Sequence, residues 1–329
     1  MTGYSRRGIL AAGALALATA GMGAASLAQD RPSLRFSAVF SEQDIRARMM
    51  ERLAEAVAED YELELHYGGT LFGQGTELVA LQRGNLEMCN IAPQDIANQI
   101  PAWSILTSAY LFRDPAHLMA FFASEAGEEM KAMAEDQLNI HILGPTFFGT
   151  RHVGLVPEGR IETPEDMSGV RLRMPPGEAW QFLGEALGAN PTAMAYAEVY
   201  TGLQTGAIDG QDNPLPNVEN MKFYEVMNQI ALTSHLVAFD LLTISSQVWN
   251  DMSEDRQQAF QAAADEAMAW SAEQHQSREA ELAEYFRDQG LEVYEPNIDA
   301  FRAYAQDRYL NSSLSADWPE GMLDRINAL

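Results

Sequence analysis

Two kinds of hydrophobic spacing alternate along most of the chain. Residues 34–39 and 61–67 place apolar side chains at every second position, which is typical of β-strands with one buried face. Between them, apolar residues recur at every fourth position, as in an amphipathic helix: Ile45, Met49, Leu53 and Val57. Ser41, with Asp44 three residues later, predicts the N-cap of that helix. The chain therefore begins as strand, helix, strand.

The same alternation continues and separates the elements into two groups. The remaining elements of the first group are predicted as helices at 76–83 and 115–137 and strands near Met88 and Ile140. A second group fills residues 151–236, and a strand at 241–246 then returns toward the first group. Two crossings between the groups form a hinge. This order predicts α/β layers with mostly parallel sheets, in two lobes.

A long helical stretch covers residues 253–288 and ends at Gly290. Its apolar residues lie on one line of the helix: Phe260, Ala264, Met268 and Ala272. Because this helix is too long to pack against one lobe only, we expect it to contact both lobes. The expected boundaries are residues 29–150 plus about 239–278 for lobe I, and 151–238 plus about 279–329 for lobe II.

The segment 169–214 carries the most polar side chains that local structure does not require. Residues 169–175 alternate as a strand with Arg173 on its exposed polar face. A strand end at 190–192 and a helix at 198–206 follow. The run DGQDNP at 209–214 has the composition of a tight polar turn beside a strand, able to hydrogen-bond a bound molecule.

The combined pattern resembles the solute-binding proteins of TRAP transporters, of the DctP type, over almost the whole chain after the N-terminal segment. The motif that carries the resemblance is NP followed by EVYTGLQTGAIDGQDNP, with the strand GVRLRMP before it. Four further segments match in order: YGGTLFGQG at 67–75, LQRGNLEM at 81–88, FYEV at 223–226 and LTSH at 232–235.

The resemblance implies a two-lobed periplasmic-binding-protein fold with a hinge and a long C-terminal helix that spans both lobes. It implies a monomer that captures a small organic-acid anion, such as a C4-dicarboxylate or a sugar acid, and delivers it to the small and large TRAP permease subunits, of the DctQ and DctM type. No cofactor and no metal ion are expected, and the sequence leaves the solute open.

Arg173 is the residue on which we expect binding to depend. A guanidinium can hold a carboxylate through two parallel hydrogen bonds, which lysine cannot reproduce, and an arginine has this role at the matching position of the family. The resemblance also implies Asn213 as a carboxylate ligand. It implies Arg151 as a second arginine ligand, with a salt bridge at the hinge as the alternative, and Tyr196 as an aromatic cover, with core packing as the alternative. The family's usual turn is DGQEN, so Asp212 shortens a side chain that we expect beside the ligand.

Weaker candidates come from loops and aromatic positions. Polar loop residues at strand ends predict Gln74 and Gln94 on the opposing wall of the pocket. Trp180 and Phe239 are pocket aromatics in one interpretation and core residues in the other.

Charge and composition exclude some partners. The 329 residues carry 21 Lys and Arg against 47 Asp and Glu, a formal net charge of -26, with 47% hydrophobic residues. Such a chain can form a core but repels nucleic-acid phosphates and anionic membrane surfaces. An anionic solute would need a local positive site.

The first 28 residues have the pattern of a signal peptide. Ser5-Arg6-Arg7 precedes an apolar stretch, and small residues end at Ala28. The twin arginines indicate the Tat route, with Sec export as the alternative. No later segment has about 18 consecutive apolar residues, so we expect no membrane span, and the periplasm as the location.

Two other functional classes were weighed. An exported enzyme is not favoured, because the chain has no GxSxG, HExxH, Walker or CxxC motif, and its six histidines lack metal-ligand spacing. The lone Cys89 is expected to be a buried strand residue. The ligand-binding subunit of a periplasmic sensing system would use the same pocket and differ only in its partner.

Overall fold

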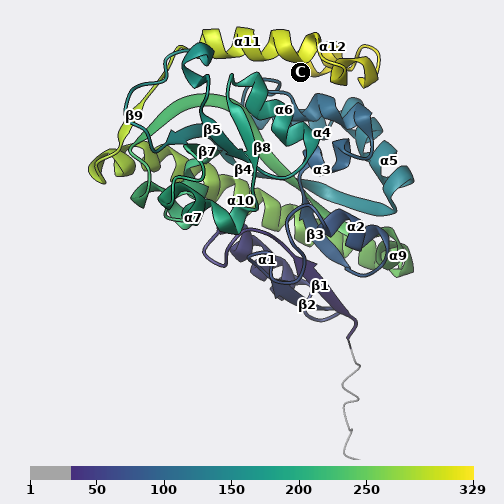
Figure 1. Ribbon diagram of the computed structural model, residues 1–329. Coiled ribbons are helices and arrows are strands. Elements are labelled where there is room, and N and C mark those ends of the chain that lie inside the picture. Colours follow the sequence, from purple (N-terminus) through teal and green to yellow (C-terminus); the bar gives the residue numbers. More distant parts are fainter. Residues whose placement is uncertain (1–30) are drawn as a thin grey trace, which may run out of the picture. The chain divides into compact units, whose positions relative to one another are not determined.

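In a computed structural model, which describes residues 31–329, strands from the whole chain join one mixed sheet (Figure 1). The order is β2-β1-β3-β8-β4-β7-β5-β6, with β9 paired to β8. The bounds are β1 Ser33–Ser37, β2 Glu62–His66, β3 Met88–Ile91, β4 Ile140–Leu155, β5 Arg171–Met174, β6 Asn190–Ala193, β7 Gly210–Pro214, β8 Gln229–Ser245 and β9 Glu292–Tyr294.

Two long antiparallel strands, β4 and β8, run through the middle of this sheet. Near one end, β8 pairs with β3, from Ile91↔Leu241 to Met88↔Ile244. Near the other end, β4 pairs with β7, and β8 pairs with β9. The predicted return strand at 241–246 was therefore too short. The expectation of mostly parallel pairing holds for five of the eight strand pairings. The central pair β4 and β8, and their pairings with β7 and β3, are antiparallel, and the central pair carries the chain between the two halves of the sheet.

Helices cover the sheet. The longer ones are α1 Ile45–Ala56, α4 Pro115–Phe122, α5 Glu125–Leu138, α6 Glu178–Ala186, α10 Glu254–Asp288 and α11 Ile298–Leu310. The shorter ones are α2 Glu77–Gln82, α3 Pro93–Ala97, α7 Val199–Gln204, α8 Leu215–Asn220, α9 Ser246–Asp251 and α12 Met322–Asn327, with short 3-10 turns such as Tyr196–Glu198. None in residues 31–329 has the length and apolar character to cross a membrane.

The long helix α10 contacts two separate hydrophobic cores, as predicted. Phe260 and Met268 pack with residues of β1 and α1. About five turns later, Leu282 and Phe286 pack with residues of α7 and the segment after β7. Ser253 caps the helix by accepting a hydrogen bond from the Arg256 amide.

Local capping differs from the prediction in two places. Helix α1 starts at Asp44, whose side chain accepts from the Arg46 amide, so Ser41 is not its cap. The single helix predicted at 115–137 is two helices, because Ser124 caps α5 and Gly127 lies against the end of α4. A Cβ on Gly127 would come within 2.2 Å of the Phe121 carbonyl oxygen, so the turn needs glycine there.

The predicted polar turn at 209–214 is a buried strand. Residues 210–214 form β7, which pairs with β4 on one side and β5 on the other. All five are buried, although three carry polar side chains. A strand inside a sheet satisfies its backbone groups through both neighbours, so its polar side chains can be directed to a site. The predicted signal segment 1–28 lies outside the described residues.

Candidate functional site

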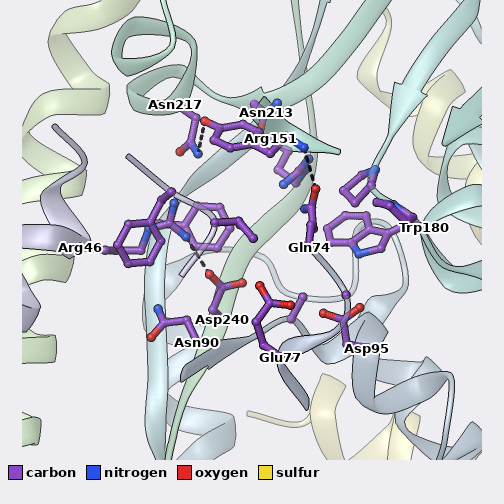
Figure 2. A pocket seen from close by; sticks show the side chains of 18 of the residues that line it. Arg46, Gln74, Glu77, Asn90, Asp95, Arg151, Trp180, Asn213, Asn217 and Asp240 are labelled. Carbon is purple, nitrogen blue, oxygen red and sulfur yellow. Dashed lines mark hydrogen bonds and ion pairs between the residues drawn. The ribbon is translucent and has the colours of Figure 1, made fainter. Parts of the chain in front are cut away.

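A pocket lies where the ends of several strands meet the loops from the other half of the sheet (Figure 2). Six of the predicted residues line it: Arg151, Arg173, Asn213, Tyr196, Gln74 and Trp180. The further polar residues of the lining are Arg46, Glu77, Asn90, Asp95, Asn217 and Asp240. We call Arg151, Arg173, Asn213 and Tyr196 the basic wall, and Glu77, Asn90, Asp95 and Asp240 the acid wall.

Arg173, in β5, is the most buried cation of the pocket. Its side chain is 1% exposed, so the prediction of an exposed strand face was wrong; Arg171 is the outward residue and pairs with Asp209 at 2.6 Å. Arg173 Nε donates to the Met194 carbonyl at 2.8 Å, and Nη2 donates to Gln74 Oε1 at 3.1 Å.

No carboxylate forms an ion pair with Arg173 among residues 31–329. Burial lowers the pKa of Arg173 to about 10, partly opposed by Asp212, and Arg151 lowers it further. That value is far above neutrality, so the side chain is charged. A buried charge without a counter-ion is costly, so this position favours an anion.

Arg151, in β4, is held from behind by Asp212. Its Nε and Nη2 donate to the two carboxylate oxygens of Asp212 at 2.7 and 3.0 Å. Its guanidinium also lies 4.9 Å from the centre of the Trp180 ring. Arg151 pairs with Pro214 in the ladder, so Asp212, two residues earlier, lies diagonal to it on the same face.

Asp212 is fully buried and does not line the pocket. The Arg151 charge and a hydrogen bond with His235 overcome its desolvation and hold its pKa well below the usual range. His235 Nε2 lies 3.2 Å from Asp212 Oδ2. His235 lies in a bulge of β8. In the pairing of β8 with β4, residues 232–235, between Ala231 and Leu236, have no partner in β4.

Gln74 connects the two halves of the pocket. Its Oε1 accepts hydrogen bonds from Arg173 Nη2 and from the Tyr196 amide at 2.8 Å. The Tyr196 hydroxyl in turn accepts from Asn217 Nδ2 at 3.0 Å. Asn213 Nδ2 donates to Gln211 Oε1 at 2.5 Å. The Gln74 side chain thus contacts the Arg173 side chain, 99 residues later in the sequence, and the backbone of Tyr196.

Two of the weaker candidates lie outside this pocket. Gln94 and Phe239 line a small neighbouring cavity that shares Trp180 with it. Phe239 belongs to a hydrophobic core and packs edge-on against Phe112 and Phe122, at ring distances of 6.0 and 5.4 Å.

The acid wall and Arg46 were missed by the sequence analysis. Arg46, at the start of α1, donates to Asp44 Oδ2 at 2.8 Å and to Asp240 Oδ2 at 2.7 Å. Its guanidinium is sandwiched between the rings of Phe40 and Phe148, at 4.3 and 4.1 Å. Its charge is therefore already neutralised.

Three carboxyl groups converge on the other side of the pocket. Burial, with the charge of Asp240, raises the pKa of Glu77 to about 7. Burial, with the charges of Glu77 and Asp240, raises the pKa of Asp95 to about 8. Burial also raises the pKa of Asp240, against the Arg46 charge. The raised pKa values keep Glu77 and Asp95 partly protonated near neutral pH, so that they can both donate and accept hydrogen bonds.

One polar cavity lined from both halves of an α/β sheet is the arrangement expected of a protein that binds a small solute. The chain belongs to the bacterial extracellular solute-binding protein family 7, the DctP family, whose model matches residues 36–314.

Solved structures with this fold include close relatives. A TRAP periplasmic solute-binding protein from Roseobacter denitrificans with bound 3-deoxy-D-manno-oct-2-ulosonic acid (KDO) is 44% identical, with a TM-score of 0.89 over 91% of this chain and 99% of that one. Another from the same organism, with bound β-D-glucuronate, is 26% identical, with a TM-score of 0.82 over 90% of this chain and 99% of that one.

Curated relatives point the same way. The sialic acid-binding periplasmic protein SiaP of Vibrio cholerae is 29% identical over 80% of this chain and 82% of its own length. The 2,3-diketo-L-gulonate-binding periplasmic protein YiaO of Escherichia coli is 28% identical over 79% of this chain and 80% of its own length. The family and the structural neighbours are solute-binding proteins of TRAP transport, and the sequence-based recognition of the family is confirmed.

Proposed function

We propose that this protein is the periplasmic subunit of a TRAP transporter that captures a sugar acid by its carboxylate. The observation that carries the proposal is Arg173, a fully buried guanidinium without an ion-pair partner among the described residues. The second arginine, Arg151, is paired with Asp212 through Nε and Nη2, but its Nη1 has no hydrogen-bond partner within residues 31–329 and can donate to the same solute carboxylate. Asn213 and Tyr196 complete the carboxylate site.

The sugar-acid class is supported by what the relatives bind. KDO, glucuronate, sialic acid and diketogulonate each combine one carboxylate with several hydroxyl or carbonyl groups. The pocket offers a matching division, with cations on one wall and hydrogen-bonding carboxyl groups on the other. A polyhydroxylated monocarboxylate is therefore the proposed solute.

Closure of two lobes around the solute would couple binding to delivery. We propose lobe I as residues 29–150 plus about 239–278, and lobe II as 151–238 plus about 279–329. We reassign α12 to lobe I, because Met322 and Ile326 join its core. A solute that contacts both lobes stabilises the closed form by its difference in affinity for the two forms.

The remaining parts of the proposal follow from the family. Residues 1–28 would direct export to the periplasm, by the Tat or the Sec route. The closed, loaded protein would dock as a monomer on the small and large permease subunits, of the DctQ and DctM type. No bond of the solute is made or broken, and no cofactor takes part.

Isothermal titration calorimetry tests the carboxylate requirement. KDO, D-glucuronate, D-galacturonate and D-gluconate would be titrated together with their methyl esters, which retain the hydroxyl groups but lack the charge. We expect at least one acid to bind and its ester to bind at least about 100-fold more weakly, since a charged hydrogen-bonded pair in a buried site is worth about 3 kcal/mol. An ester that binds as well as its acid contradicts the proposal.

A further inference from the structure

The acid wall is assembled from four separate elements. Glu77 is the first residue of α2, Asn90 lies in β3, Asp95 lies in α3 and Asp240 lies in β8. Figure 2 shows them together on one side of Gln74, with Arg151, Asn213 and Asn217 on the other side. Four elements that direct polar side chains into one cavity indicate a binding surface.

The charges on this wall are only partly compensated. Asp240 is paired with Arg46, whose other partner is Asp44. Neither Glu77 nor Asp95 forms an ion pair within residues 31–329. Burial raises the pKa of both groups, the charge of Asp240 raises both further, and the charge of Glu77 also raises the pKa of Asp95. A further negative charge at this place would add to a repulsion that the wall already carries.

Unpaired amide groups on the same pocket point to a ligand. Both side-chain polar atoms of Asn90 are buried and have no hydrogen-bond partner within the part of the chain described. The same holds for Oδ1 of Asn217, a residue that is 3% exposed. Buried amide atoms without partners are unfavourable. Hydroxyl groups, which donate and accept, would satisfy both the amides and the carboxyls.

Within residues 31–329, no group of three or more His, Cys, Asp or Glu side chains is placed to hold a metal ion. A cationic amine would be attracted by the carboxylates, but it only donates hydrogen bonds and would leave Nδ2 of Asn90 without an acceptor. Hydroxyl groups are the better match.

We infer that Glu77 and Asp95 determine specificity: they bind the hydroxyl groups of the solute and exclude a second carboxylate. This inference rests on the proposed capture of a carboxylate by the basic wall. The inference adds an orientation of the solute, with its carboxylate at Arg173 and its hydroxyl groups at the acid wall. It also predicts that the protein rejects dicarboxylates.

Matched pairs of acids provide the test. D-Gluconate and D-glucarate, or D-galactonate and galactarate, are open-chain acids that differ in whether the far end carries a hydroxymethyl group or a carboxylate, and D-glucuronate, KDO and succinate extend the panel. With calorimetry at pH 7.5, we expect the best monocarboxylate to bind the wild-type protein at least 100-fold more tightly than the best dicarboxylate. The double variant Glu77→Gln, Asp95→Asn should lower this ratio at least tenfold, because it removes charge and keeps the shape of the wall.

Controls separate specificity from folding and from the proposed function. Asp136→Asn, an exposed acid on α5, should leave the ratio unchanged, and circular dichroism and melting temperature establish that each variant folds. If the double variant fails to fold, each single variant is measured, and the wild-type ratio is followed from pH 8 to pH 5. Dicarboxylate binding should then tighten as pH falls, with proton uptake detected as a dependence of the heat on the buffer.

The outcomes are distinct. A dicarboxylate that binds the wild type as tightly as the best monocarboxylate overturns the inference but leaves carboxylate capture intact. The inference is also overturned, with carboxylate capture left intact, if the folded variants keep the wild-type ratio of monocarboxylate to dicarboxylate affinity. If Arg173→Lys has no effect on the binding of any acid in the panel, the proposed function itself fails.

Discussion

The two walls of the pocket are built alike around an arginine, yet they offer opposite charge to a solute. On the basic wall, Arg151 is held by Asp212, which contacts His235. On the other side, Arg46 is held by Asp44, and His275 Nε2 lies 3.8 Å from Asp44 Oδ1. The two walls differ in the third charged side chain that lies beside each arginine–aspartate pair.

That third group decides which wall can receive an anion. Asp240 adds a second carboxylate to Arg46 and neutralises it. Arg173 adds a second guanidinium beside Arg151, and no carboxylate pairs with it in residues 31–329. Two similar frameworks thus acquire opposite polarity, in a protein whose overall charge repels anions. The ion pairs within the pocket, rather than the net charge of the protein, therefore determine which wall can bind an anion.

Breaking the ion pair behind the basic wall should give the largest effect. Asp212→Asn leaves the buried Arg151 without a counter-ion and should cost about 3 kcal/mol of stability. Asp44→Asn should cost less, since Arg46 keeps Asp240. Chemical denaturation of the unliganded proteins measures both. Asp209→Asn, from the exposed pair with Arg171, is the control and should cost less than about 1 kcal/mol. Equal losses in Asp212→Asn and Asp209→Asn would contradict this.

Replacing the unpaired cation should act on affinity instead. Arg173→Lys keeps the charge but loses the planar fork, and we expect the best acid to bind about 100-fold more weakly. Calorimetry of Arg173→Lys beside Arg171→Lys, on the same strand but facing solvent, separates the site from the strand. Similar affinities for the two variants would remove Arg173 from the binding site.

The acid wall should make stability depend on pH. Glu77 and Asp95 have folded pKa values of about 7 and about 8, above their usual range, so the folded state holds protons that the unfolded state releases. Their contribution is complete below about pH 4 and is lost as pH rises to 8. Glu279, raised by burial to about 7 in α10, adds to the same trend.

Between pH 8 and pH 5, these carboxyl groups should raise the melting temperature of the unliganded protein as the pH falls, at about 2–4 °C per kcal/mol. His152 and His235, whose pKa values are lowered by burial, act in the opposite direction over the same range, because the unfolded state takes up their protons. The readout is therefore the comparison of the wild type with the double variant Glu77→Gln, Asp95→Asn. When the pH is lowered from 8 to 5, the melting temperature of the variant should rise less, or fall more, than that of the wild type, and equal changes in the two proteins would contradict the assignment.

The smallest expected effect is at the bridge between the walls. Gln74→Ala removes the acceptor for Arg173 Nη2 and for the Tyr196 amide, and should weaken binding of the best acid about threefold to tenfold, for hydrogen bonds worth about 1 kcal/mol each. Gln82→Ala, which loses an exposed hydrogen bond with Gln99, is the matched control. Calorimetry that shows tighter binding by Gln74→Ala would mean that the bridge competes with the solute.

The basic wall could be predicted from sequence because Arg173, Tyr196 and Asn213 lie in or beside the motifs that carry the family resemblance, which also implied Arg151. The strand that carries Arg173 alternates cleanly, and the polar run up to Asn213 stands between glycine and proline. The same run was misread as a turn, since a strand buried on both sides with Gln211, Asp212 and Asn213 in it has the composition of a loop. Only its pairing with β4 and β5 reveals the strand.

The acid wall could not be predicted, because its residues are ordinary in their local context. Glu77 at the first turn of a helix suits the helix dipole and needs no further explanation. Asp240 lies in a strand whose bulges interrupt the alternation, so only its last part was recognised. The sequence around Arg46 indicates only an ordinary position of an amphipathic helix. Their approach depends on how four elements pack, which local patterns do not specify.

A crystal structure of the protein with its bound acid tests the central claim most directly. The account predicts the solute carboxylate within hydrogen-bonding distance of Arg173 and Arg151, with hydroxyl groups against Glu77 and Asp95. A carboxylate bound at the Arg46 side, or Arg173 turned away from the solute, would contradict it.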